Sequence, residues 1–160
     1  MAALDPADDL AIRRLVHRYA DAVVRRDAAA WASCWTEQSS WDLGGGRSVE
    51  SKQQITALWR RAMGGMAAVV QMVHNGAAET ASDPDRATGR WYIDERFRRA
   101  DGTDGILLAY YDDEYVREAD GEWRFARRAL VAHYNGPPDL SAGFNNTRTA
   151  LEAAGTSVEI

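Results

Sequence analysis

Apolar residues recur every three to four positions in the first part of the chain and mostly at every second position after it. The first spacing predicts a helix from near Leu10, capped by Asp8 or Asp9, with Tyr19 in its buried stripe. Asp27 opens a second, short helix that carries Trp31, Cys34 and Trp35. The chain therefore begins with helices that each present one apolar face.

A brief strand and a third helix follow. Residues 41–43 alternate in polarity between a polar turn over residues 36–40 and a glycine loop over residues 44–46. A serine at position 48 or 51 can cap a helix that runs to about Met63, where two glycines end it.

Long alternating segments predict strands in the second part of the chain, over residues 67–81, 87–99, 105–117 and 122–134. The joints between them contain the Asp, Gly or Pro that tight reversals need. Helices followed by antiparallel strands predict an α+β fold, with the helices packed on one face of a curved antiparallel sheet. Because Asn-Gly-Pro-Pro follows Tyr134, we expect one domain over residues 1–136 and a C-terminal tail over 137–160 that covers a cavity or an interface.

Composition narrows the functional classes. A chain of 160 residues can form one domain with a core and a ligand cavity. The net charge of −5 and the scattered arginine pairs argue against a nucleic-acid binder. The single cysteine, Cys34, is interpreted as a core residue. No apolar run is long enough to span a bilayer, so we expect a cytoplasmic protein without a membrane partner.

His74 directly follows the most apolar run of the chain, residues 66–73. Counting every second position places it on the same strand face as Val70 and Met72, so its imidazole is predicted to face inward. An inward imidazole can take and return a proton near neutral pH, which makes His74 a candidate general base. The alternative is a core histidine that only satisfies a hydrogen bond.

Glu95 shares a strand face with three bulky apolar residues, Trp91, Ile93 and Phe97. A buried carboxylate must be paired, hydrogen-bonded or protonated. The alternative is an edge position at which Glu95 reaches water. In the last two strands the alternation does not decide which face is buried.

Motifs for cofactor chemistry are missing from the sequence. The three histidines are far apart and show no metal-ligand spacing, so no metal is expected. No serine elbow, phosphate loop or dinucleotide fingerprint is present, so no cofactor is expected either. Catalysis would have to rely on His, Tyr, Glu, Asp and Arg side chains.

The order of elements and several local segments resemble the NTF2-like superfamily, in particular its SnoaL-like branch. The resemblance covers residues 8–135 and implies a cone-shaped fold. The segments that carry it are Ile12 to Asp27, Trp31, residues 35–41, Val-His-Asn-Gly at 73–76, Asp-Glu-Tyr at 113–115 and Asp-Gly-Glu-Trp-Arg-Phe at 120–125. This superfamily includes dehydratases, isomerases, cyclases, epoxide hydrolases and binding proteins, so the fold does not by itself imply one function.

The most similar chemistry is that of the scytalone dehydratase and hexachlorocyclohexane dehydrochlorinase group, which eliminates water or HCl without a cofactor. The resemblance implies that His74 is the general base and that Arg128 lines the cavity. Tyr19 could polarise a substrate carbonyl. The remaining substrate-binding positions that we expect are Trp41, Trp59, Met63, Met66, Glu95, Ala109 and Tyr111.

Val24 departs from this pattern, because the family usually has an aspartate there that orients the histidine. Losing such an orienting group can cost several orders of magnitude in rate. Either Glu95 replaces it, or Asp21 or Asp42 does, or the site no longer performs elimination.

The leading hypothesis is a cofactor-free lyase or isomerase that acts on a small cyclic or polyketide-like molecule. The alternatives are a polyketide cyclase, which would use the same base, and a non-catalytic binding protein. Epoxide hydrolysis would require an Asp-Arg-Asp arrangement around a water, of which only Arg128 can be assigned. The resemblance also implies a homodimer or homotrimer.

Overall fold

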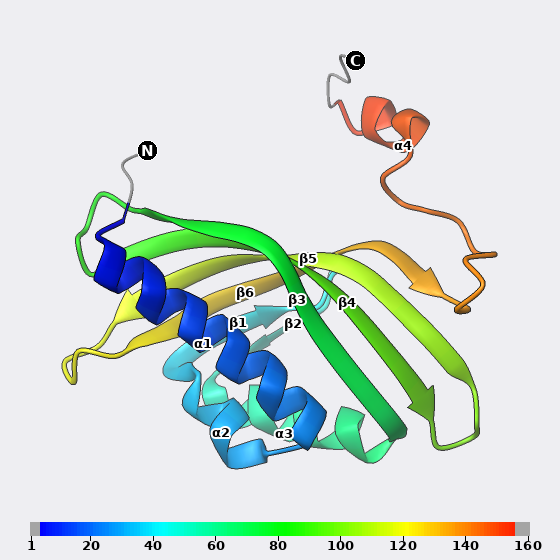
Figure 1. The fold of residues 1–160 in the computed structure, drawn as a ribbon, viewed down its shortest axis with the longest axis horizontal. Helices are drawn as coiled ribbons and strands as arrows, with labels where there is room; N and C mark the ends of the chain where they lie inside the picture. Colours follow the sequence, from blue (N-terminus) through cyan, green and yellow to red (C-terminus); the bar gives the residue numbers. More distant parts are fainter. Residues whose placement is uncertain (1–3, 156–160) are drawn as a thin grey trace.

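The computed structural model describes residues 4–155 and contains one strongly curved sheet with three helices on its concave side (Figure 1). The helices are α1 (Pro6–Arg25), α2 (Ala28–Ser33), α3 (Lys52–Gly64) and α4 (Arg148–Ala153). The strands are β1 (Trp35–Asp42), β2 (Ser48–Glu50), β3 (Met66–Thr80), β4 (Arg86–Arg99), β5 (Asp104–Arg117) and β6 (Trp123–Gly136). The strand order is β2-β1-β6-β5-β4-β3.

The predicted α+β architecture and its four long strands are confirmed, and their joints are tight turns as expected. The sheet is mixed, however, because β1 pairs with β6 in parallel. Residues 36–40, predicted as a polar turn, belong to strand β1, and the short strand β2 was not predicted. Those residues are polar because β1 has an exposed side, while Ser39 is buried and bonds to the carbonyl of Thr36.

Side-chain caps fix where the helices begin. Asp27 accepts a hydrogen bond from the N–H of Ala30, and Ser51 caps α3, as predicted. The predicted cap of the first helix is wrong, because α1 starts earlier, at Pro6. Asp5 is its cap and accepts from the N–H of Ala7. Proline suits this start because it has no N–H to leave unpaired at the first helical position.

The core lies between the helices and the concave side of the sheet, which we call the interior. Its helical half is rich in tryptophan: the rings of Trp31 and Trp59 stack with centroids 4.8 Å apart. Cys34 is completely buried among these rings, which confirms its interpretation as a core residue. Large aromatic rings bury much apolar area each, so this half of the core contributes strongly to stability.

The tail leaves the end of β6 in two parts. Its first part packs near Tyr134, which contacts the ring of Phe144 and donates to the carbonyl of Pro137. Helix α4 then stands away from the sheet and the other helices (Figure 1). The predicted tail extends to residue 160, of which residues 156–160 lie outside the described part, as do residues 1–3 of the predicted domain.

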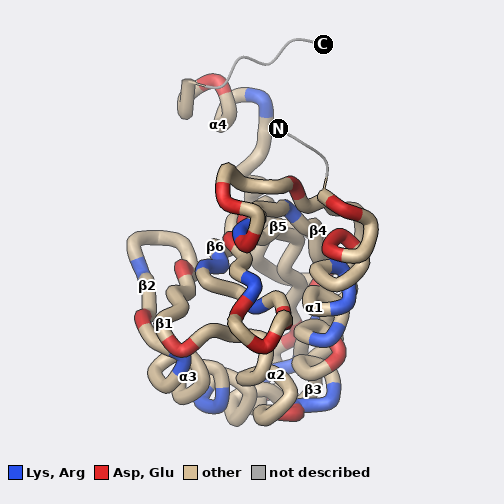
Figure 2. The backbone as a smooth tube through the Cα atoms, turned by 90° about the vertical axis from the view of Figure 1, so that its left-hand side faces the viewer, with Lys and Arg blue, Asp and Glu red and all other residues tan. Residues whose placement is uncertain are grey.

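Charged residues of both signs alternate over the body of the molecule (Figure 2). Many of them form ion pairs on exposed strand positions, such as Arg98 with Asp104. Within residues 4–155, no helix is long and apolar enough to cross a membrane.

Candidate active site

Arg128 on β6 is the centre of the polar part of the interior. Its Nε and Nη2 atoms each donate to Asp113 on β5 at 2.8 Å, and the two side chains are 1% and 0% exposed. The rings of Tyr19, Tyr111 and Phe125 surround the guanidinium, with centroids 4.2, 3.9 and 3.9 Å from its Cζ atom. The rings partly replace the hydration that a buried cation loses.

The partners of Asp113 hold this ion pair in one geometry. The hydroxyl of Tyr115 donates to Asp113 at 2.8 Å, and the indole N–H of Trp91 donates to that hydroxyl at 2.8 Å. Burial alone would lower the pKa of Arg128, but the charge and hydrogen bonds of Asp113 outweigh this effect and raise it. Arg128 is therefore a fixed positive charge whose position is set by three other side chains.

Two phenols lie beside this charge. The Tyr19 and Tyr111 rings meet edge to face, with centroids 6.0 Å apart. Burial raises the pKa of Tyr19 despite the opposing charge of Arg128. Burial raises the pKa of Tyr111 even further, and the neighbouring Tyr19 adds to this. Both phenols thus keep their protons at neutral pH and can act as hydrogen-bond donors.

Glu95 on β4 and Gln71 on β3 form a second polar group in the interior. The Nε2 atom of Gln71 donates to Glu95 at 2.7 Å, and Gln71 is only 4% exposed. Burial raises the pKa of Glu95, while the Gln71 hydrogen bond works in the opposite direction. The predicted inward orientation of Glu95 is confirmed.

Most positions expected to line the interior do so. Arg128, Tyr19, Ala109 and Tyr111 are buried there, which settles the orientation of the last two strands. Trp41 and Trp59 are also buried, and Met63 and Met66 are partly buried against the core.

His74 is different, and its predicted inward orientation is wrong. It is exposed, and so are Val70 and Met72, which are 40% and 55% exposed on the same strand. Gln71, predicted to point outward, faces the interior instead because it pairs across the strands with Glu95. A register shift between Val73 and Gly76 then interrupts the alternation at His74.

None of the carboxylates considered as partners for His74 is engaged with it. Glu95 binds Gln71, Asp21 pairs with Arg25, and Asp42 pairs with Arg127. Sequence reasoning missed the role of Gln71. The signal was available, because the inward Glu95 needs a partner and β3 is the neighbouring strand.

A cavity of about 660 Å³ lies between the loop after β1 and strand β6. Its lining combines surface residues such as Arg47 with Leu107, Leu130 and Ala132, which pack against the core. Asn145 of the tail also lines it and holds its place by bonding to the carbonyl of Ala132. Outward-facing residues such as Asp112 and Val131 also line it, so the cavity adjoins both faces of the sheet and reaches the interior side only at Leu107, Leu130 and Ala132.

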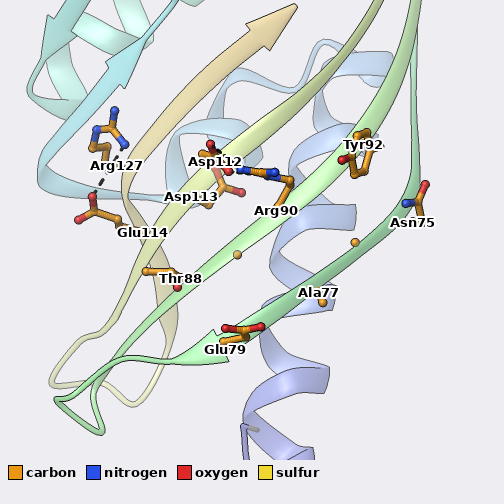
Figure 3. Close-up of a pocket in the computed structure, with 12 residues that line it drawn as sticks. Asn75, Ala77, Glu79, Thr88, Arg90, Tyr92, Asp112, Asp113, Glu114 and Arg127 are labelled. Atoms are coloured by element: carbon orange, nitrogen blue, oxygen red, sulfur yellow. Dashed lines mark hydrogen bonds and ion pairs between the residues drawn. The ribbon is translucent and has the colours of Figure 1, made fainter. Parts of the chain in front are cut away.

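A larger depression of about 810 Å³ lies on β3, β4, β5 and β6, away from α1, and Asn75 lies at its edge (Figure 3). Four of its charged residues are already paired, Arg90 with Asp112 at 2.8 Å and Arg127 with Glu114 at 3.8 Å, whereas Oε2 of Glu79 has no hydrogen-bond partner among the described residues. No group of His, Cys, Asp and Glu suited to a metal is found among the described residues. The interior remains the better candidate for chemistry, since it holds a fixed positive charge, two protonated phenols and an incompletely hydrogen-bonded Gln71–Glu95 pair in an apolar setting.

Comparison with known proteins identifies relatives of this architecture. A family model described as a SnoaL-like domain matches residues 6–129. Comparison of the sequence with curated proteins gives no match.

Three solved structures illustrate the similarity. Hexachlorocyclohexane dehydrochlorinase LinA-type3 from Novosphingobium barchaimii is 20% identical, with a TM-score of 0.73 over 84% of this chain and 92% of that one. The Kfla4162 protein from Kribbella flavida is 26% identical, with a TM-score of 0.73 over 85% and 98%. ActVI-ORFA from Streptomyces coelicolor is 20% identical, with a TM-score of 0.66 over 77% and 95%.

Proposed function

The chain belongs to the SnoaL-like domain family, and from this premise we propose that it is a cofactor-free lyase or isomerase for a small, mostly apolar cyclic or polyketide-like molecule. The structural similarity to a hexachlorocyclohexane dehydrochlorinase supports this reaction class. A cyclase would share the first step, since carbon–carbon closure also begins with removal of a proton.

The observation that carries the proposal is the set of donors around Arg128. Removing a proton next to a carbonyl leaves negative charge on the carbonyl oxygen, and fixed donors stabilise that charge without reorganising. Tyr19 offers a protonated phenol, and Arg128 uses only some of its five N–H groups on Asp113. The surrounding apolar walls strengthen both interactions because they exclude water.

A second candidate, a non-catalytic binding protein, is favoured by one observation. The family's catalytic pair maps onto His74 and Val24, and both of these side chains are exposed here. A protein of this fold that lacks the pair could bind the same class of molecule without converting it.

The experiment starts with thermal-shift measurements on small cyclic ketones and naphthols, because ligands that bind the folded state raise its stability. Each ligand found is then incubated with the protein in D₂O, and NMR follows deuterium exchange and product formation. Tyr19→Phe, which keeps the ring and removes the donor, should slow the reaction by roughly 10²-fold, as loss of one such donor does elsewhere. Tyr110→Phe on the outer side of β5 is the matched control and should leave the rate unchanged. Binding without exchange or product in the wild type would favour the binding protein.

A further inference from the structure

Glu95 differs from the other interior carboxylate in what it is bound to. Both oxygens of Asp113 already accept hydrogen bonds from Arg128, so Asp113 is held in an ion pair. Glu95 receives one hydrogen bond, from Gln71, and no ion pair among the described residues includes it. It is therefore a partly buried carboxyl that no cation holds in its charged form.

Gln71 can serve this carboxyl in both of its protonation states. Its amide N–H donates to the carboxylate in the present geometry. If the amide turns over, its oxygen can accept from the protonated carboxyl instead. An acid–base group that must both take and return a proton needs such a partner.

The oxygen of Gln71 points to the chemistry of a ligand. In the present geometry Oε1 is buried and has no hydrogen-bond partner, although the residue is only 4% exposed. Burying an acceptor without a donor is unfavourable. A hydroxyl or N–H group of a bound molecule would satisfy it, next to the carboxyl of Glu95.

The surroundings of Glu95 connect it with the cavity and with the phenols. Leu107 is its direct neighbour across β4 and β5, and this residue lines the 660 Å³ cavity. The negative charge of Glu95 also contributes to the raised pKa of both Tyr19 and Tyr111, after the larger effect of burial. The charge of Arg128, which also acts on the phenols, is balanced by Asp113.

We propose that Glu95 is the residue that exchanges a proton with the substrate, and that Gln71 orients it and accepts a hydrogen bond from the substrate. The inference rests on the proposed function and names its base. The substrate is then a neutral carbonyl compound with a hydroxyl or N–H group within reach of Gln71.

The proton balance is simple. Ionised Glu95 takes a proton from the carbon next to the carbonyl, so the C–H bond breaks and an O–H bond forms. The released electron pair moves into the enolate, whose oxygen faces the phenol donors. Glu95 then returns the proton either to another carbon, which completes an isomerisation, or to a departing hydroxyl, which leaves as water.

The test uses 2-tetralone as the probe for proton exchange, with loss of its α-protons in D₂O followed by NMR. Wild-type protein should accelerate the exchange, and Glu95→Gln should reduce this acceleration by about 10²-fold or more, the usual contribution of a general base. Phenol binding, measured by calorimetry, checks that the interior stays intact and should change less than about threefold. Glu114→Gln, an exposed carboxylate on β5, is the matched control and should exchange like the wild type.

Gln71→Leu separates positioning from packing. The Gln71 hydrogen bond lowers the pKa of Glu95, so its loss should move the rising limb of the pH–rate profile to higher pH. A purely structural role would lower the rate equally at every pH and leave the limb in place, which would overturn the role of Gln71. The wild type should also bind phenol at least about tenfold more tightly than anisole, which lacks the donor, and Gln71→Leu should lose this preference.

The outcomes distinguish the two proposals. Exchange by the wild type that Glu95→Gln leaves unchanged would overturn the role of Glu95 and leave the proposed function standing. Phenol binding without exchange by the wild type would overturn the proposed function, and the role of Glu95 with it.

Discussion

Asp113→Asn tests whether the buried charge of Arg128 depends on its partner. The substitution keeps the shape of the side chain and replaces one acceptor oxygen by an NH₂ group. In the wild type both carboxylate oxygens accept from Arg128. In the variant, at least one N–H of the guanidinium therefore faces the new NH₂ group. The variant also leaves a positive charge that is 1% exposed without a counter-charge, and an arginine cannot lose its proton to escape this cost.

Breaking a buried ion pair from one side typically costs about 3–5 kcal/mol. The three rings around Arg128 remain in the variant, so we expect the lower half of this range. For a domain of this size the full range corresponds to a fall of roughly 6–20 °C in Tm, at about 2–4 °C per kcal/mol. Such a loss is a large part of the total stability of a typical domain.

The assay is urea unfolding at pH 7 for the wild type, Asp113→Asn, Arg128→Met and the double variant. The asparagine keeps an acceptor for Tyr115, so the cycle isolates the pair with Arg128. We expect the double variant to be less destabilised than the sum of the single variants by about 2 kcal/mol or more. A cost below about 1 kcal/mol for Asp113→Asn, or additivity within about 0.5 kcal/mol, would refute the reasoning.

Three further predictions concern β3 and β4. The pKa of Glu95 is raised above its ordinary value of 4.5 in the folded state, so the wild type should lose stability as the pH rises from 4.5 through the folded-state pKa. Unfolding free energies of Glu95→Gln measured across this window should lack that loss, and parallel curves for the two proteins would contradict the prediction. Gly76→Ala should cost about 1–3 kcal/mol in urea unfolding, because its methyl group would meet the buried Trp91 ring and lie 2.5 Å from the carbonyl oxygen of Arg90. The matched variant Gly64→Ala points into open space and should not be destabilised, so equal losses in both would argue against this packing. His74→Ala should change stability by less than about 0.5 kcal/mol and leave phenol binding intact, since the side chain is exposed, whereas loss of phenol binding would place His74 in the interior.

The orientation of β3 shows where sequence patterns reach their limit. The run over residues 66–73 is apolar on both faces, so its alternation has only Gln71 as a polar marker. A polar residue is usually taken to face water, and an error of one position moves every side chain to the other face. Here Gln71 faces inward because Glu95 lies directly across from it. The orientation of β4 was predictable from its three bulky residues, whereas that of β3 depends on the pairing between the strands.

Arg128 and Tyr19 could be predicted to share the interior, since the helical stripe places Tyr19 there and the family resemblance places Arg128 there. What the sequence could not show is the partner of Arg128. Asp113 is one of several carboxylates along β5, and its neighbour Asp112 faces the other side and pairs with Arg90. The twist and register of the sheet decide which of two adjacent aspartates meets the arginine.

This pairing also limits what the interior can bind. The charges of Arg128 and Asp113 cancel at close range, so the interior has little net charge with which to attract an anionic substrate. A second carboxylate brought near Glu95 would also meet a like charge in an apolar setting, which is unfavourable unless one of them is protonated. A neutral molecule avoids both costs when it enters and develops charge only as its proton leaves, next to donors that are already in place. For the proposed reaction, the same contacts that stabilise the fold would thus favour a neutral substrate and a transient anion.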